Sequence, residues 1–174
     1  MHKFFANMDE IVNKVAGSGL ITIDLEEFYP KNPMHVIDIA PWLIEGVLLR
    51  EKEFRAHLRS QDWQVYQDSL VAINCSTDAI LPAWAFPLVS LHLAPVADLV
   101  VQGNTKDLLA AYYRRFIDQM DTEVYNDARV LLKGCAKKEI PQDVFVALSQ
   151  KLYGVVKSLM FGEACSTVPM YKKQ

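Results

Sequence analysis

The chain has few of the features that mark membrane, secreted or nucleic-acid-binding proteins. No stretch approaches the roughly 20 apolar residues of a membrane span. The first residues, MHKFFANMDEIVNKV, carry acids where a secretory signal would need a long apolar core. The formal net charge of −3 provides no bulk attraction for nucleic acid or for an anionic membrane. We therefore expect a cytoplasmic protein that binds neither nucleic acid nor a membrane.

Short motifs that carry chemistry are scarce as well. The sequence has no CxxC or HExxH pattern, and no Ser-His-Asp arrangement can be assembled from its segments. The segment AGSG at 16–19 precedes a predicted strand instead of following one, so it predicts a helix end and not a phosphate-binding loop. The sequence therefore names no reaction, no substrate and no oligomeric state.

The length and composition are those of a soluble globular domain. The chain has 174 residues, of which 51% are hydrophobic and 22% are charged. A chain of this length buries roughly 70% of its unfolded surface. We expect residues 1–174 to form a single domain that folds without disulfide bonds.

Strand-like and helix-like segments alternate along the chain. Apolar, β-branched runs predict strands at 20–25, 35–40, 69–74, 97–103, 128–134 and 157–162. Helical spacing predicts helices at 8–19, 41–61, 77–93, 104–120 and 141–156, with a bend near Pro87. This alternation predicts an α/β fold: a three-layer sandwich whose mostly parallel sheet, of about five or six strands, carries helices on both faces.

Three cysteines follow predicted strands. Cys75, Cys135 and Cys165 each lie at or just past the carboxyl end of one. Parallel strands would bring all three thiols to one edge of the sheet, which is where α/β sheets bind small ligands. An odd number of cysteines without an export signal favours free thiols or metal ligands over disulfide bonds. The pattern predicts a metal site, with zinc favoured because thiolates bind it well in tetrahedral geometry.

Asp78 is the best-placed fourth ligand. It lies three residues after Cys75, in the first turn of the predicted helix, although an ordinary helix N-terminal acid would occupy the same position. Glu139 and Glu163 are weaker candidates near the other cysteines. His92 lies far along the same predicted helix, roughly 20 Å from the edge at 1.5 Å per residue, so we expect it to pack and not to bind metal.

Two other interpretations of the cysteines stay open. Free cysteine is among the most buried residue types, so the three can be core filling in a non-catalytic interaction or structural domain. They can also be unligated reactive thiols. Within the metal-binding interpretation, three cysteines can hold an iron–sulfur cluster, which would colour the protein whereas zinc would not.

Basic and aromatic residues also occur near the cysteines. They could promote thiolate formation or attract an anionic ligand, although a solvated surface role is commoner for such lysine pairs. The aromatic residues could wall a small pocket at the same edge, although such residues are more often core. The lysines are Lys137, Lys138, Lys172 and Lys173, and the aromatic residues are Trp84, Phe86 and Tyr171.

Several long segments resemble one protein family. DEIVNKVAGSGLITIDLEEFYP, CSTDAILPAWAF, LLKGC and GEACSTVPMYK are similar to a bacterial family catalogued as domain of unknown function 2480, and the likeness runs along nearly the whole chain. The resemblance implies a small, single-domain, soluble bacterial protein. It implies no activity for any position, so the metal hypothesis depends on the strand-end argument alone.

Overall fold

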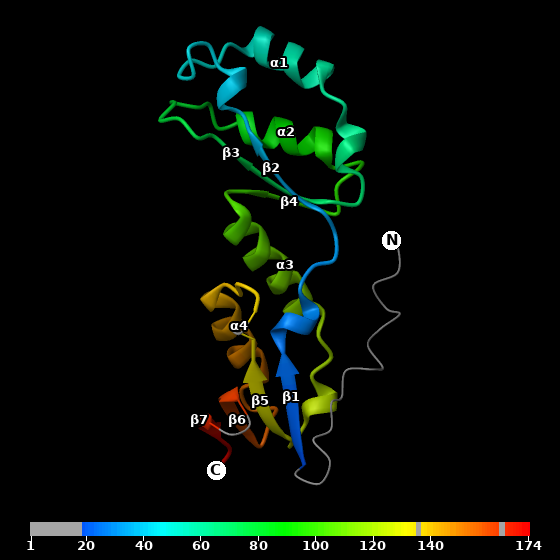
Figure 1. Cartoon of the computed structure of the whole chain (residues 1–174), viewed down its shortest axis with the longest axis vertical. Coiled ribbons are helices and arrows are strands. Elements are labelled where there is room, and N and C mark those ends of the chain that lie inside the picture. Colours follow the sequence, from blue (N-terminus) through cyan, green and yellow to red (C-terminus); the bar gives the residue numbers. More distant parts are fainter. Residues whose placement is uncertain (1–18, 135–136, 164–165) are drawn as a thin grey trace. The chain divides into compact units, whose positions relative to one another are not determined.

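The computed structural model describes residues 19–134, 137–163 and 166–174 (Figure 1). The chain divides into two compact units. Unit 1 comprises residues 1–29 and 114–174, and unit 2 comprises residues 30–113. The division falls within helix α3 (Thr105–Gln119). Among the described residues, no helix combines the length and apolar character that crossing a membrane requires. The helix predicted from residue 8 lies outside the described ranges.

Unit 2 is built on a parallel three-stranded sheet. Its strands are β2 (Met34–Asp38), β3 (Leu70–Asn74) and β4 (Leu99–Gln102), in the order β2-β3-β4. Helix α1 (Glu51–Ser60) connects β2 to β3, and helix α2 (Ala85–Leu93) connects β3 to β4. Central β3 is buried from Leu70 to Ile73, which explains its unbroken apolar sequence.

The core of unit 2 lies between its sheet and helices α1 and α2. Both helices contribute to one cluster, so they pack against the sheet face that Val71 and Ile73 present. The buried helix residues of this cluster recur at helical spacing. They are Phe54 and Leu58 of α1, and Ala85, Val89 and Leu93 of α2.

Unit 1 is built on a mixed four-stranded sheet in the order β1-β5-β6-β7. Strands β1 (Leu20–Asp24), β5 (Arg129–Lys133) and β6 (Ser158–Glu163) are parallel, and β7 (Ser166–Lys172) runs antiparallel to β6. Helix α4 (Gln142–Leu152) connects β5 to β6 and buries Val144, Leu148 and Leu152. Its Phe145 ring meets Phe161 of β6 edge-on, with ring centroids 5.2 Å apart. These contacts fix α4 on one face of the sheet.

Short 3-10 helices occur in the connections of both units. They are η2 (Leu25–Phe28), η3 (Ala40–Trp42), η4 (Trp63–Tyr66) and η5 (Glu123–Tyr125). Helices η2 and η4 begin at aspartates, Asp24 and Asp62, whose carboxylates accept hydrogen bonds from backbone N–H groups of the first turn. The positions of η2 and η4 therefore follow from capping by these aspartates.

The α/β class is confirmed, but the single mostly parallel sheet is wrong. The strands divide between two sheets, because β1 pairs with β5 and β2 pairs with β3. The sheet of unit 1 is mixed because of β7, which the sequence did not reveal. Pro169 interrupts the strand pattern of β7, and an edge strand with a register shift at Leu159/Met160 tolerates it. The three-layer sandwich with helices on both faces and the single domain stay predictions.

Two helices are shorter than predicted. The helix predicted at 41–61 begins at Glu51, because Glu45 and Gly46 have positive φ angles of 53° and 71° and form a turn instead. The helix predicted at 77–93 begins at Ala85. Pro87 therefore lies in the first helical turn, where a missing N–H costs no helical hydrogen bond, and the predicted reason for a bend disappears.

Phe54 provides a test of the unit 2 core. Its ring is completely buried and lies 5.8 Å from the ring of Trp42 and 6.1 Å from that of Trp84, centroid to centroid. We expect Phe54→Ala to lower the free energy of unfolding by about 3–5 kcal/mol, because it leaves a cavity between these rings. Val65→Ala is the control, since Val65 is 59% exposed. Chemical denaturation of both variants measures this difference. Equal losses of unfolding free energy in Phe54→Ala and Val65→Ala would contradict this packing.

Candidate functional site

Asp38 ties the carboxyl ends of β2 and β3 together in unit 2. It ends β2 opposite Asn74, the last residue of β3. The Ser76 hydroxyl donates a hydrogen bond of 2.6 Å to Asp38 Oδ2, and the N–H groups of Ser76 and Ala40 donate to Oδ1 at 3.0 and 2.9 Å. The hydroxyl of Ser76 is the largest influence on the pKa of Asp38, which is lowered although burial opposes the shift. Asp38 is therefore an ionised, hydrogen-bonded anchor.

Cys75 lies next to this anchor at the end of β3. Its half-buried thiol Sγ is 3.4 Å from Thr77 Oγ1 and 3.6 Å from the Thr77 carbonyl oxygen. The Thr77 hydroxyl donates a hydrogen bond to the Gly46 carbonyl oxygen. The Cys-Ser-Thr segment is thus fixed on two sides, by Asp38 through Ser76 and by the 45–46 turn through Thr77. A thiol held in this way has a defined position.

Asp78 does not lie where the sequence predicted. The helix that follows begins at Ala85, so Asp78 is not in a first turn and cannot act as a helix N-terminal acid. Its side chain is exposed. Within the described ranges, no hydrogen-bond donor or cation engages its carboxylate. Asp78 therefore follows Cys75 in a loop outside the helices and strands, with an exposed carboxylate that is accessible to a ligand.

The carboxyl edge of the unit 1 sheet carries an ion-pair cluster. Asp24, Lys133 and Glu163 end the parallel strands β1, β5 and β6. Lys133 Nζ lies 3.1 Å from Glu163 Oε2 and 3.8 Å from Asp24 Oδ2. The pKa of Lys133 is raised, first by its hydrogen bond to Glu163 and also by the charges around it. This cluster was not predicted, although each of the three strands ends in a charged residue.

The segment that follows β5 is attached to helix η2. Glu26 Oε1 accepts hydrogen bonds from the N–H groups of Lys137 and Lys138, at 2.8 and 3.4 Å. Lys138 Nζ lies 4.3 Å from the centroid of the Tyr29 ring, a cation–π distance. Gly134 has a φ of +139°, and a Cβ there would lie 2.9 Å from Leu25 Cβ, so glycine is required. These contacts bring the backbone on both sides of residues 135 and 136 against η2.

The three-cysteine site stays a prediction. Cys135 and Cys165 lie outside the described residues, as do Ala136 and Ala164. Cys75 belongs to unit 2, whereas Gly134 and Glu163, which flank the undescribed pairs, belong to unit 1. Among the residues that the structure describes, no three His, Cys, Asp or Glu side chains form a group able to hold a metal ion.

The structure describes the surroundings of the other residues that were considered as a fourth ligand. Glu139 is exposed, and Glu163 is paired with Lys133. The prediction that His92 packs is confirmed, because its ring stacks on Trp63 at a centroid distance of 5.2 Å. Of the carboxylates considered as fourth ligands, Asp78 and Glu139 are therefore the two without a cation beside them in the described structure.

Lys172 and Tyr171, which were candidates for a role at the carboxyl edge, lie away from that edge. Strand β7 runs back along β6, so that Lys172 faces Ser158 at the amino end of that strand. Tyr171 packs on the ring of Tyr153, with centroids 4.9 Å apart. Lys173 follows β7 and lies beside Asp127, 3.9 Å from its Oδ1. This group is therefore at the amino edge of the sheet.

The other two aromatic candidates pack in unit 2. Trp84, immediately before α2, lies against the Phe54 ring. Phe86 is partly buried against the unit 2 core cluster. Both therefore contribute to the packing of unit 2.

Ser76→Ala tests the Asp38 anchor. The lowered pKa of Asp38 stabilises the fold above its ordinary value of 3.8, and this contribution is lost as the pH falls through the folded-state value. We expect the substitution to raise the pKa of Asp38 and to lower the free energy of unfolding by about 1 kcal/mol at neutral pH, with less effect in acid. Carboxyl NMR titration and denaturation at both pH values measure these changes.

Ser60→Ala is the matched control, because the Ser60 hydroxyl donates to the His57 carbonyl oxygen and touches no carboxylate. It should leave the pKa of Asp38 unchanged. An unchanged Asp38 titration in Ser76→Ala would show that the Ser76 hydroxyl does not stabilise the carboxylate.

Comparison with known proteins adds a family but no activity. No curated protein and no solved structure matches the chain. A family model matches residues 9–173, which include all of unit 2, most of unit 1, the Cys-Ser-Thr segment after β3 and all three cysteines. The chain therefore belongs to the family described as "Protein of unknown function (DUF2480)".

Proposed function

We propose that the chain binds a metal ion, zinc in preference to others, through Cys75, Cys135 and Cys165. Three thiolates and one oxygen ligand form a common tetrahedral zinc site, with Zn–S bonds of about 2.3 Å and sulfurs about 4 Å apart. Asp78 is the proposed oxygen ligand. With Asp78 as a ligand, the protein is a small metal-binding protein. If water occupies the fourth position instead, the protein would be a metal-dependent enzyme, because zinc lowers the pKa of bound water to about 7.

The ends of β5 and β6 are the observation that carries this proposal. These strands are neighbours and parallel, and Lys133 and Glu163 at their ends are in contact. Cys135 and Cys165 each follow two residues later. Two residues extend at most about 7 Å, and neighbouring strands lie about 4.8 Å apart. The chain therefore allows these two thiols to reach one ion.

The surroundings of Cys75 and Asp78 support their part in the proposal. Cys75 directly follows the last residue of β3, as the other two cysteines follow their strands. Its thiol has oxygen atoms of Thr77 beside it, and no cation of a described residue is in contact with it. Asp78 follows with an exposed carboxylate. Thiolate and carboxylate oxygen are both common zinc ligands.

One observation favours a second candidate, in which the cysteines have a structural role. Cys75 packs against the core cluster of unit 2, and a half-buried thiol often acts as a small apolar side chain. On this alternative the protein is a non-catalytic interaction or structural domain and holds no metal. An iron–sulfur cluster on the same three cysteines is the third alternative, and it would absorb visible light.

Metal content measured beside thiol reactivity separates these candidates. We expect the full chain, purified without oxygen and without added metal, to hold one zinc ion and to protect its thiols from a thiol reagent. Cys135→Ser should lose the ion and expose the remaining thiols, because a serine hydroxyl is a poor zinc ligand. A loss of stability in Cys135→Ser does not separate the candidates. A serine hydroxyl placed in an apolar site, with no metal involved, also costs roughly 1–3 kcal/mol.

Cys75→Ser and Cys165→Ser test the ligands one at a time. If Cys75→Ser keeps the ion, Cys75 is not a ligand, and the site is formed by Cys135 and Cys165. Asp78→Asn should weaken zinc binding, whereas Asp62→Asn should not, because Asp62 caps η4 and asparagine caps equally well. A wild-type chain without metal, whose thiols stay reactive when zinc is supplied, would overturn the proposal. A visible absorbance in the wild-type chain that disappears in Cys135→Ser would show that the cysteines hold an iron–sulfur cluster and not zinc.

A further inference from the structure

Three cationic side chains gather at the amino edge of the unit 1 sheet. The strand registers place Arg129 of β5 opposite Ser158 of β6, and Ser158 opposite Lys172 of β7. Directly paired residues on neighbouring strands point to the same face of a sheet. Lys157 immediately precedes β6. This row and Lys157 together bring three positive charges and one hydroxyl to the lining of one pocket.

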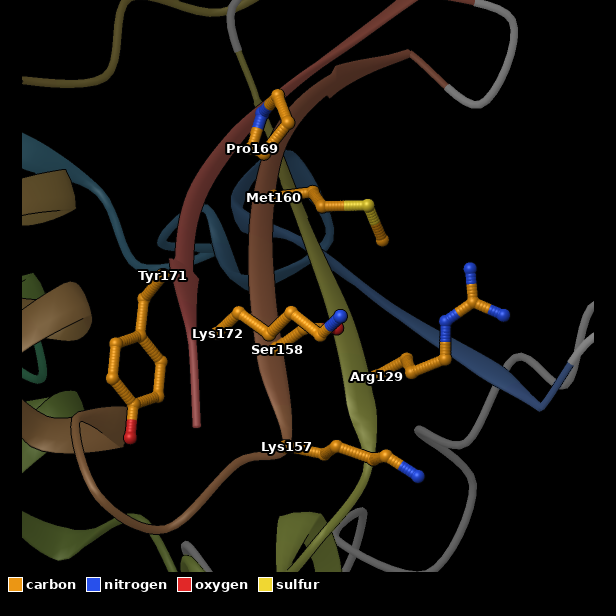
Figure 2. Close-up of a pocket in the computed structure, with 7 residues that line it drawn as sticks. All are labelled: Arg129, Lys157, Ser158, Met160, Pro169, Tyr171 and Lys172. Atoms are coloured by element: carbon orange, nitrogen blue, oxygen red, sulfur yellow. The ribbon is translucent and has the colours of Figure 1, made fainter. Parts of the chain in front are cut away.

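These residues line an open pocket of ≈ 390 Å³, which we call the basic pocket. Figure 2 shows Arg129, Lys157 and Lys172 extending from the strands toward the same side as Met160, whereas the Tyr171 ring extends toward the opposite side. Met160 faces Pro169 across β6 and β7, so apolar surface adjoins the cations. The pocket thus offers positive charge at one end and apolar contact at the other.

The charges of the basic pocket are not neutralised by the described part of the protein. Lys133 and Lys173, the neighbouring cations, have carboxylate oxygens 3.1 and 3.9 Å away. No described carboxylate lies within 4 Å of the charged nitrogens of Arg129, Lys157 or Lys172. The Ser158 hydroxyl has no hydrogen bond to a described residue. An uncompensated cluster of this kind stands out in a chain with a net charge of −3.

We infer that the basic pocket binds a small phosphate monoester with an apolar organic part. A phosphate takes several charge-assisted hydrogen bonds, and the guanidinium of an arginine matches two of its oxygens. Arg129, Lys157 and Lys172 supply the charge, and the Ser158 hydroxyl supplies a further donor. The organic part would lie on Met160. This inference is independent of the proposed metal site, because Cys135 and Cys165 follow strands that end at the opposite edge of this sheet.

Phenyl phosphate is a suitable probe of the pocket. In ¹⁵N NMR titrations of the full chain we expect saturable shifts centred on the backbone amides of Arg129, Ser158 and Lys172. Inorganic phosphate should bind the same amides more weakly, because it lacks the apolar part. Phenol should cause no saturable shift, because it lacks the charge. Equal binding of phenol and phenyl phosphate would overturn the inference.

Charge-removing variants separate a site from general electrostatic attraction. Arg129→Gln, Lys157→Gln and Lys172→Gln should each weaken phenyl phosphate binding about two- to fivefold at physiological salt, as expected for partly exposed charged contacts. Lys52→Gln is the matched control, because it removes the same charge from an exposed position on α1 of unit 2. It should leave the affinity unchanged.

Three outcomes would contradict a phosphate site. They are shifts that do not saturate, shifts spread evenly over all lysines and arginines, and an equal loss of affinity in Lys52→Gln and Lys172→Gln. The amide spectrum of each variant without ligand reports whether the fold is intact. Should Arg129→Gln perturb β5, Lys157→Gln provides the same test from outside the strand.

Discussion

The parallel pairing of β1 with β5 is the constraint on which unit 1 depends. Leu20–Asp24 pairs along Arg129–Lys133, so two segments far apart in the sequence are neighbours in one sheet, with β1 at its edge and β5 inside it. All of unit 2 lies between these strands in sequence. The entropy cost of closing such a long loop grows only logarithmically with its length, and the buried apolar residues of β1 and β5 offset it. Every later feature of unit 1 is positioned by this pairing.

The pairing explains why charged residues gather at the carboxyl edge. Parallel strands in register end together, so Asp24 and Lys133 arrive side by side and β6 adds Glu163. The resulting ion pairs are partly exposed and contribute little to stability. Their importance is positional. They fix three strand ends at the edge where α/β sheets bind ligands, directly before the segments that contain Cys135 and Cys165.

Both units hold the segments after their strands in a similar way. In unit 2 the Asp38 carboxylate binds the N–H and hydroxyl of Ser76, and in unit 1 the Glu26 carboxylate binds the N–H groups of Lys137 and Lys138. Each carboxylate comes from the neighbouring strand or the turn after it. Carboxylate-to-backbone bonds of this kind order a loop without covering it. A loop ordered in this way keeps its side chains accessible, as a binding site requires.

The sequence by itself determined where strands β1 to β6 and most of the helices lie, and the tertiary structure decided which strands pair. Apolar runs such as 69–74 and 128–134 predicted β3 and β5 correctly, because a strand buried on both faces must be apolar throughout. The sequence of β1 does not indicate that β1 pairs with β5 instead of β2, because the choice of partner strand depends on long-range packing. The reversal of β7 was hidden by Pro169, and it moved Lys172 from the cysteine edge to the basic pocket. The positions of cysteines at strand ends were therefore readable from the sequence, whereas the grouping of charges arose from strand order and direction.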